Sequence, residues 1–142
     1  MTSVSWLHLT DLHLGMAEQR SLLPIVKDRF FEDLKLLHAK CGPWDLMLFT
    51  GDLTQRGNAE EFQMVDEFLD ELWERFGELG SRPRLLAIPG NHDLVRPKPK
   101  EPVVKLLRDA WVTDDEVRAE FWNNPESPYR ATVTGAFANY VS

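Results

Sequence analysis

Three short polar clusters contain the residue types that metal-dependent chemistry requires. The candidate ligands and catalytic groups are Asp11 and His13 in the first cluster, Asp52 in the second, and Asn91, His92 and Asp93 in the third. Carboxylate, imidazole and amide oxygen together suit divalent cations such as Mn, Fe or Zn. No thiolate accompanies them, which argues against a structural zinc site.

Each cluster taken alone also has a plainer interpretation. An isolated D-x-H can be a capped turn, and Gly-Asp or Gly-Asn-His-Asp can be a tight turn with Asx hydrogen bonds. Three such clusters after three successive predicted strands are improbable by accident. Because ligands of open α/β sheets bind at the carboxyl ends of the strands, we expect all three clusters at one edge.

Short apolar runs alternate with longer amphipathic segments along the first part of the chain. Strands are predicted at 4–10, 45–50 and 84–88, with helices at 24–41 and 58–77. Helical spacing places Val26, Phe30, Leu34, Leu37 and Cys41 on one apolar face of the first helix, and Asn58 is expected to cap the second. This order predicts an α/β fold with a parallel βαβαβ sheet.

The pattern changes after Asp93. Residues 96–102 are rich in Pro and Lys, 102–111 are expected to be helical, and Thr113 with Glu116 predicts a capping box for a short helix. A loop at 123–128 and an ambiguous stretch at 129–142 follow. We therefore expect one domain over 1–142, with a βαβαβ core at 1–93 and a helical and loop extension at 94–142.

Composition limits the classes of function. The 142 residues include 16 Lys and Arg against 23 Asp and Glu, a net charge of −7, which argues against a dedicated DNA-binding module. No apolar run is long enough to span a bilayer and the N-terminus lacks a leader pattern, so no membrane partner is expected. The single cysteine, Cys41, fits a reducing compartment and predicts a cytoplasmic location.

As a set, the clusters resemble the signature of the calcineurin-like metallophosphoesterases, which reads D-x-H, G-D-x4-G and G-N-H-[D/E] in that order. The resemblance implies a layered α/β/β/α fold that hydrolyses a phosphodiester or phosphomonoester with two divalent ions (Mn, Fe or Zn) and a bridging hydroxide. It implies the following roles: Asp11 and His13 on the first metal, Asp52 between the metals, Asn91 on the second metal, His92 at the phosphate or leaving group, and Asp93 orienting the His92 ring.

The family pattern continues with a further histidine and a G-H-x-H pair, whereas no histidine follows His92 in this chain. His8 is expected to be a strand residue and His38 a surface residue of the first helix, so neither replaces the missing ligands. We therefore expect the N-terminal half of the fold, cut within an element and weakly active or inactive alone. C-terminal domains or a partner chain would complete the site.

The residue sequences of the motifs do not identify the phosphoester substrate. The second and third motifs are similar to those of cyclic-nucleotide phosphodiesterases, and residues 8–15 are similar to DNA-repair nucleases, so a cyclic nucleotide, a nucleotide or nucleic acid remains possible. The basic segment Arg96–Arg108 either attracts an anionic substrate or is a solvated loop. The alternative function is a catalytically incomplete metal-binding sensor or interaction module of a larger multidomain protein.

Overall fold

The computed structural model describes residues 3–17 and 23–141. Residues 1–2, 18–22 and 142 lie outside the described part. They include the first residues of the N-terminus, which lacks a leader pattern, and the last residue of the ambiguous stretch 129–142. The elements are β1 (Trp6–Leu9), α1 (Leu23–Cys41), β2 (Leu46–Thr50), α2 (Ala59–Glu78), β3 (Arg84–Ile88), α3 (Pro102–Ala110), α4 (Asp115–Asn123) and α5 (Pro128–Gly135).

The three strands form one parallel sheet in the order β1-β2-β3. Leu7 pairs with Met47, which pairs in turn with Leu85. Strands this short and apolar, joined by helices, can pair only in parallel once each helix crosses back over the sheet. The predicted parallel βαβαβ arrangement is confirmed, although β1 is shorter than the predicted strand 4–10.

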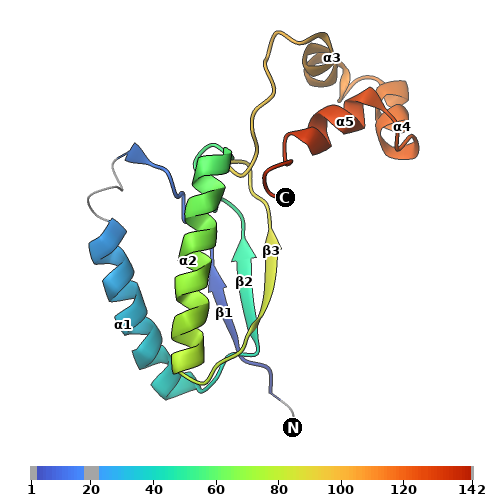
Figure 1. Cartoon of the computed structure of the whole chain (residues 1–142). Helices are drawn as coiled ribbons and strands as arrows, with labels where there is room; N and C mark the ends of the chain where they lie inside the picture. The colour runs from blue at the N-terminus through green and yellow to red at the C-terminus, as the bar shows by residue number, and fades with distance from the viewer. Residues whose placement is uncertain (1–2, 18–22, 142) are drawn as a thin grey trace.

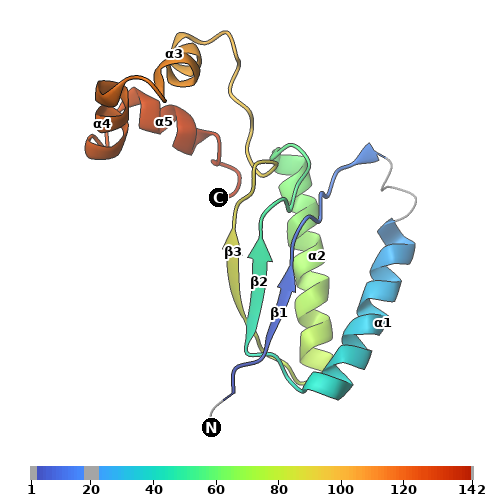
Figure 2. The same ribbon diagram turned by 180° about the vertical axis from the view of Figure 1, so that it is seen from behind.

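Helices α1 and α2 lie on the same face of the sheet (Figures 1 and 2). The buried apolar side chains between these elements are Leu14, Phe31, Leu34, Trp44, Met47, Phe49, Leu53, Val65, Phe68, Leu72 and Phe76. On the opposite face, Trp6, Leu86 and Ile88 are 60%, 56% and 53% exposed. Within the described residues, the core is therefore one-sided.

The apolar face predicted for α1 is only partly correct. Leu34 is buried, but Val26 and Leu37 are 58% and 43% exposed. Phe31 is buried instead, because its ring stacks on Phe68 of α2 with 6.3 Å between the ring centroids. The buried stripe of α1 therefore runs through residues 31 and 34.

His38 is also more enclosed than a surface histidine. It is half-buried, and its ring lies edge-on to Trp44 with the ring centroids 5.4 Å apart. The expectation of a surface position is therefore wrong, because the end of α1 packs against the segment that enters β2. Among the described residues, His38 belongs to no group of three or more possible metal ligands.

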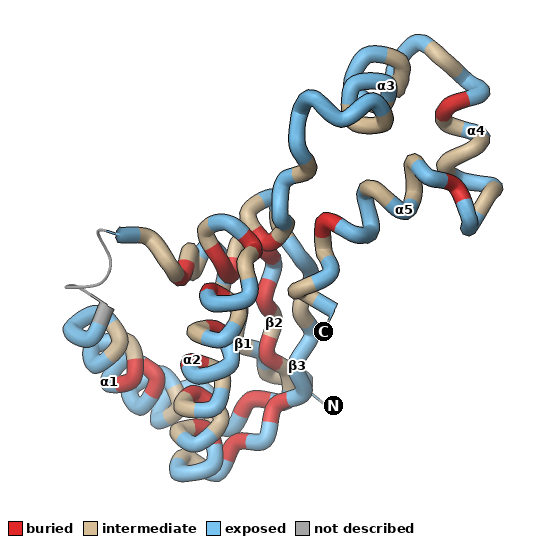
Figure 3. Tube along the Cα trace, turned by 45° about the horizontal axis from the view of Figure 1, so that its top comes forward, coloured by how far each residue is buried: buried red, intermediate tan, exposed pale blue. Residues whose placement is uncertain are grey.

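Beyond β3 the chain leaves the sheet and forms α3, α4 and α5 past the carboxyl ends of the strands (Figure 1). Most of this segment is exposed (Figure 3). The cap of α4 is Asp114, whose side chain accepts from the amides of Glu116 and Val117, so the predicted Thr113 capping box is wrong. A carboxylate one residue nearer the helix reaches both free amides.

The chain then returns to the sheet. The amide of Val95 donates to the carbonyl of Ala136 at 2.8 Å, and the side-chain amide of Asn139 donates to the carbonyl of Gly57 at 2.9 Å. The C-terminal residues therefore brace the loops that follow β2 and β3. None of the helices in the described residues combines the length and the apolarity needed to cross a bilayer.

Candidate metal centre

The loop after β1 (residues 10–15) and the loop after β2 (residues 51–57) continue the pairing of the strands. The amide of Asp11 donates to the carbonyl of Gly51 at 3.2 Å, and that of His13 donates to the carbonyl of Asp52 at 2.9 Å. The amide of Leu14 then donates to Leu53 at 2.9 Å. These main-chain bonds hold the first two polar clusters side by side, as the sequence predicts.

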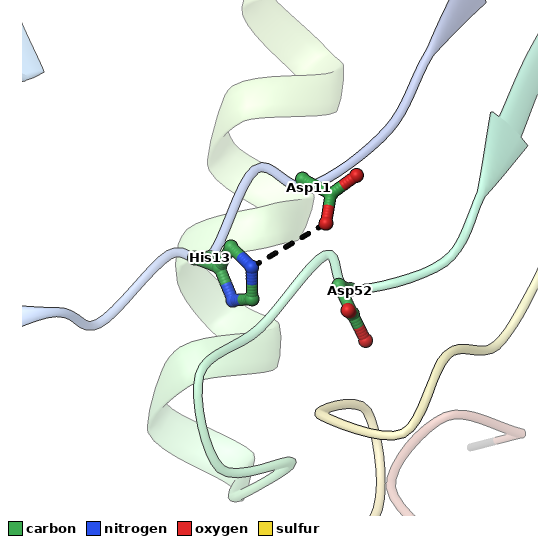
Figure 4. A group of neighbouring side chains, drawn as sticks. All are labelled: Asp11, His13 and Asp52. Carbon is green, nitrogen blue, oxygen red and sulfur yellow. Dashed lines mark ion pairs between the residues drawn. The ribbon is translucent and has the colours of Figure 1, made fainter.

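Asp11, His13 and Asp52 form a compact cluster of possible ligands (Figure 4). Each offers one ligand atom, and these atoms all lie within 4.8 Å of one another. His13 Nε2 is 3.6 Å from Asp11 Oδ1, while the buried Nδ1 has no hydrogen-bond partner among the described residues. Two carboxylates and an imidazole with an unsatisfied nitrogen fit a divalent cation.

The same three residues have an unusual backbone. Asp11, His13 and Asp52 have φ angles of 56°, 47° and 55°, and among the described residues they are the only non-glycine residues with positive φ. Such conformations cost on the order of 1–3 kcal/mol each and concentrate at functional sites. The main-chain bonds between the two loops oppose this cost, and the Thr10 hydroxyl adds a bond to Asp11 Oδ2 at 2.8 Å.

The loop after β3 (residues 89–94) joins the cluster through Asp52. The amide of His92 donates to Asp52 Oδ1 at 2.9 Å. Gly90 permits this approach, because a Cβ at that position would meet the Asp52 carboxylate and lie 2.6 Å from the Asp52 amide nitrogen. Asn91 is exposed and lines a cavity together with His92.

The His92 ring is fixed on two sides. Its Nδ1 lies 2.9 Å from the main-chain carbonyl of Gln55. A carbonyl only accepts hydrogen bonds, so Nδ1 carries the proton and Nε2 is the atom free to exchange one. The ring also meets the ring of His13 edge-on, with centroids 4.7 Å apart, which places His92 directly beside the candidate ligands.

Asp93 does not make the expected contact with the His92 ring, since Gln55 makes it instead. Asp93 is fully buried, and its Oδ1 accepts from the amide and the hydroxyl of Thr54 at 2.8 Å and 3.1 Å. Its Oδ2 accepts from the amide of Gly90 at 2.9 Å. Asp93 therefore ties the second loop to the third.

Tyr140 lies near this buried carboxylate. Burial raises the pKa of the Tyr140 phenol, and the charge of Asp93 raises that pKa further. The Tyr140 ring also meets Phe62 of α2, with 6.1 Å between the ring centroids. The returning C-terminal segment thus places the Tyr140 phenol against α2 and within the electrostatic influence of Asp93.

Two further residues, Glu61 and Gln55, hold the loops of the site and are not predicted by the sequence pattern. Glu61 lies in the first turn of α2, where it is buried, and its Oε2 accepts from the amide of Arg56 at 2.6 Å. Its side chain also fills the space beside Gly15, where a Cβ would approach Glu61 Cγ to 2.5 Å. Gln55 contacts the His92 ring through its main-chain carbonyl, so the type of its side chain does not indicate this role.

His8 lies on the uncovered face of the sheet. It is exposed, and its Nε2 is 2.7 Å from the Thr50 hydroxyl, in keeping with the strand position expected from the sequence.

With this geometry established, comparison with known proteins identifies the class. The family model for calcineurin-like phosphoesterases matches residues 5–135. The match covers most of the 142 residues, and the chain belongs to the calcineurin-like phosphoesterase family. Its members are generally hydrolases of phosphoesters that bind divalent metals. No curated protein matches the chain.

Proposed function

We propose that this chain carries the first metal-binding half of a phosphoesterase that hydrolyses a phosphodiester or a phosphomonoester. The carrying observation is the cluster of Asp11, His13 and Asp52 on left-handed backbone in a member of this family. Asp11 and His13 would hold one divalent ion, Asp52 would contact both ions, and Asn91 would hold the second. When bound, the two ions would clamp the phosphate and activate the attacking water.

The residues around the cluster support defined roles in this proposal. Because Gln55 holds the Nδ1 proton of His92, Nε2 is the atom that can deliver a proton to the leaving-group oxygen. The His92 amide occupies Oδ1 of Asp52, which leaves Oδ2 for a ligand. Asp93 is a positioning residue, because it acts through the two loops that it joins.

We also propose that residues outside this sequence complete the second metal shell. No histidine follows His92 in the 142 residues, although the resemblance implies three more. Those ligands would come from a further domain or a partner chain. Mn, Fe and Zn all suit the donor set, and the free, exposed Cys41 supports a reducing, cytoplasmic location.

Hydrolysis of bis(p-nitrophenyl) phosphate and p-nitrophenyl phosphate, with and without Mn²⁺, tests the proposal. We expect the 142-residue chain to give a low, Mn²⁺-dependent rate that Asp52→Asn abolishes. Asp66→Asn, the same change at an exposed position of α2, should leave the rate unchanged. A protein that includes the residues completing the second shell, binds Mn²⁺ and still leaves both esters intact would contradict hydrolysis and favour the sensor or interaction module.

A further inference from the structure

The carboxylate of Asp11 is bound by the side chain of the residue that precedes it. The Thr10 hydroxyl donates to Asp11 Oδ2 at 2.8 Å, while the main-chain carbonyl of Thr50 lies farther from the same hydroxyl, at 3.4 Å. A hydroxyl has one proton to donate, and a hydrogen bond to a charged acceptor is stronger than one to a neutral acceptor. The Thr10 proton therefore points to Oδ2 of Asp11.

The other oxygen of this carboxylate faces the remaining candidate ligands. Asp11 Oδ1 lies 3.6 Å from His13 Nε2 (Figure 4), and Asp52 completes the group to which both residues belong. Because Oδ2 already accepts the bond from Thr10, Oδ1 is the oxygen left for a cation between these side chains.

Thr10 itself has a defined position. It directly follows β1, and its hydroxyl lies beside the end of β2 because Leu9 pairs with Phe49. Branching at Cβ restricts the χ1 angle of threonine, so the hydroxyl has few alternative directions. The amide of Asp11 is bound as well, to the carbonyl of Gly51 at 3.2 Å. Separate bonds therefore fix the main chain and the carboxylate of Asp11.

We propose that Thr10 is a positioning residue of the metal centre, whose hydroxyl turns the Asp11 carboxylate so that Oδ1 faces His13. The bond restricts the rotation of a carboxylate that is otherwise exposed, which reduces the ordering cost of binding a cation. Asp52 is restricted in a similar way by the amide of His92, but only a side-chain hydroxyl can be removed by substitution. This inference rests on the proposed function for the role of Asp11 as a metal ligand.

The side-chain rotamer of Asp11 tests this proposal without metal. In the isotope-labelled, metal-free chain, the Hα–Hβ coupling constants of Asp11 should show one dominant χ1 rotamer, as expected for a fixed side chain. Thr10→Val keeps the shape of the side chain but removes the hydroxyl, so the couplings should shift to averaged values. Averaged couplings in the wild-type chain, or couplings that Thr10→Val leaves unchanged, would overturn the proposal.

Mn²⁺ affinity measures the consequence for the metal centre. In a titration that follows the EPR signal of free Mn²⁺, Thr10→Val should weaken binding about 10-fold, the lower end of the usual effect of disturbing the support of a metal ligand. Thr10→Ser keeps the hydroxyl and should restore most of the affinity.

Thr134→Val is the matched control for this titration. Thr134 is also exposed, and its hydroxyl donates to the carbonyl of Arg130 within α5 at 2.9 Å, so its loss should leave the Mn²⁺ affinity unchanged. A serine variant at position 10 as weak as the valine variant, or an equal loss of affinity in Thr134→Val, would contradict the role of the Thr10 hydroxyl.

The two measurements separate this proposal from the proposed function. If the Asp11 rotamer depends on the Thr10 hydroxyl in a chain that binds no Mn²⁺, the metal centre is overturned and the orientation of Asp11 by Thr10 is supported. Conversely, tight Mn²⁺ binding that is equal in the wild-type chain and in Thr10→Val overturns the role of Thr10 alone.

Discussion

Left-handed backbone at Asp11, His13 and Asp52 links ligand placement to local strain. Their side chains converge because their main chain bends in a way that L-residues avoid. In glycine the same bend costs little, but glycine has no ligand atom. The strained backbone therefore lowers local stability, but it fixes the positions of the three candidate ligand side chains.

Two variants of Asp11 separate strain from ligation. Both Asp11→Ala and Asp11→Gly remove the carboxylate, so both should weaken Mn²⁺ binding. Because only glycine relieves the backbone at φ 56°, urea unfolding of the metal-free protein should show Asp11→Gly more stable than Asp11→Ala by about 1 kcal/mol. An alanine variant as stable as the glycine variant would show that the bend is not strained.

A second pair of variants tests the structural role of Asp93. Its two oxygens accept three bonds from Thr54 and Gly90, and an amide cannot accept at both atoms. Asp93→Asn should lower the free energy of unfolding by about 1–3 kcal/mol, the cost of leaving a buried group unpaired. If the loss in urea is no larger than that of Asp66→Asn, Asp93 does not brace the loops.

The sequence predicts which residues are candidate ligands, but not which residues hold those ligands in place. Asp11, His13 and Asp52 were predicted because carboxylates and imidazole after strands are the residues that bind metals. The Gln55 carbonyl could not be predicted, because every residue has a carbonyl and only the fold selects one. The resemblance implies that Asp93 orients the His92 ring, whereas its buried side chain accepts hydrogen bonds from Thr54 and Gly90.

The three loops act as one unit because they interlock. The first pairs with the second through main-chain bonds, and the second meets the third where Gly90 lies against Asp52. Strands and helices set the ends of these loops, and their order followed directly from the apolar periodicity. Periodicity did not predict which residues of α1 are buried, because that depends on packing against Phe68. It also did not predict the cap of α4, because that depends on which of two adjacent residues reaches the free amides.

Gly90→Ala tests this interlocking. The added methyl group would displace the Asp52 carboxylate, so we expect Mn²⁺ affinity to fall roughly 10–100-fold, the usual effect of disturbing the support of a metal ligand. Gly77→Ala is the matched control, because nothing lies within 4 Å of a Cβ at that helical position. Equal affinities in a Mn²⁺ titration of both variants would contradict the close approach.

At the scale of the whole molecule, the candidate ligands Asp11, His13 and Asp52 lie at one end of a sheet that is covered on a single face (Figure 1). Trp6, Leu86 and Ile88 remain exposed on the other face among the described residues, while the chain beyond β3 returns to brace the second and third loops. Periodicity predicted the sheet, but not this return. Its contacts, two hydrogen bonds and the ring contact of Tyr140 with Phe62, join residues far apart in sequence and leave no periodic pattern.

The metal content of the purified chain tests the central claim most directly. After incubation with Mn²⁺ and gel filtration, elemental analysis should find about one tightly bound ion per chain, because the proposed second site has only Asp52 and Asn91 as ligands in this sequence. Asp52→Asn should lose this ion and Asp66→Asn should retain it. An unmetallated chain, or equal metal loss in both variants, would contradict a metal centre built on Asp11, His13 and Asp52.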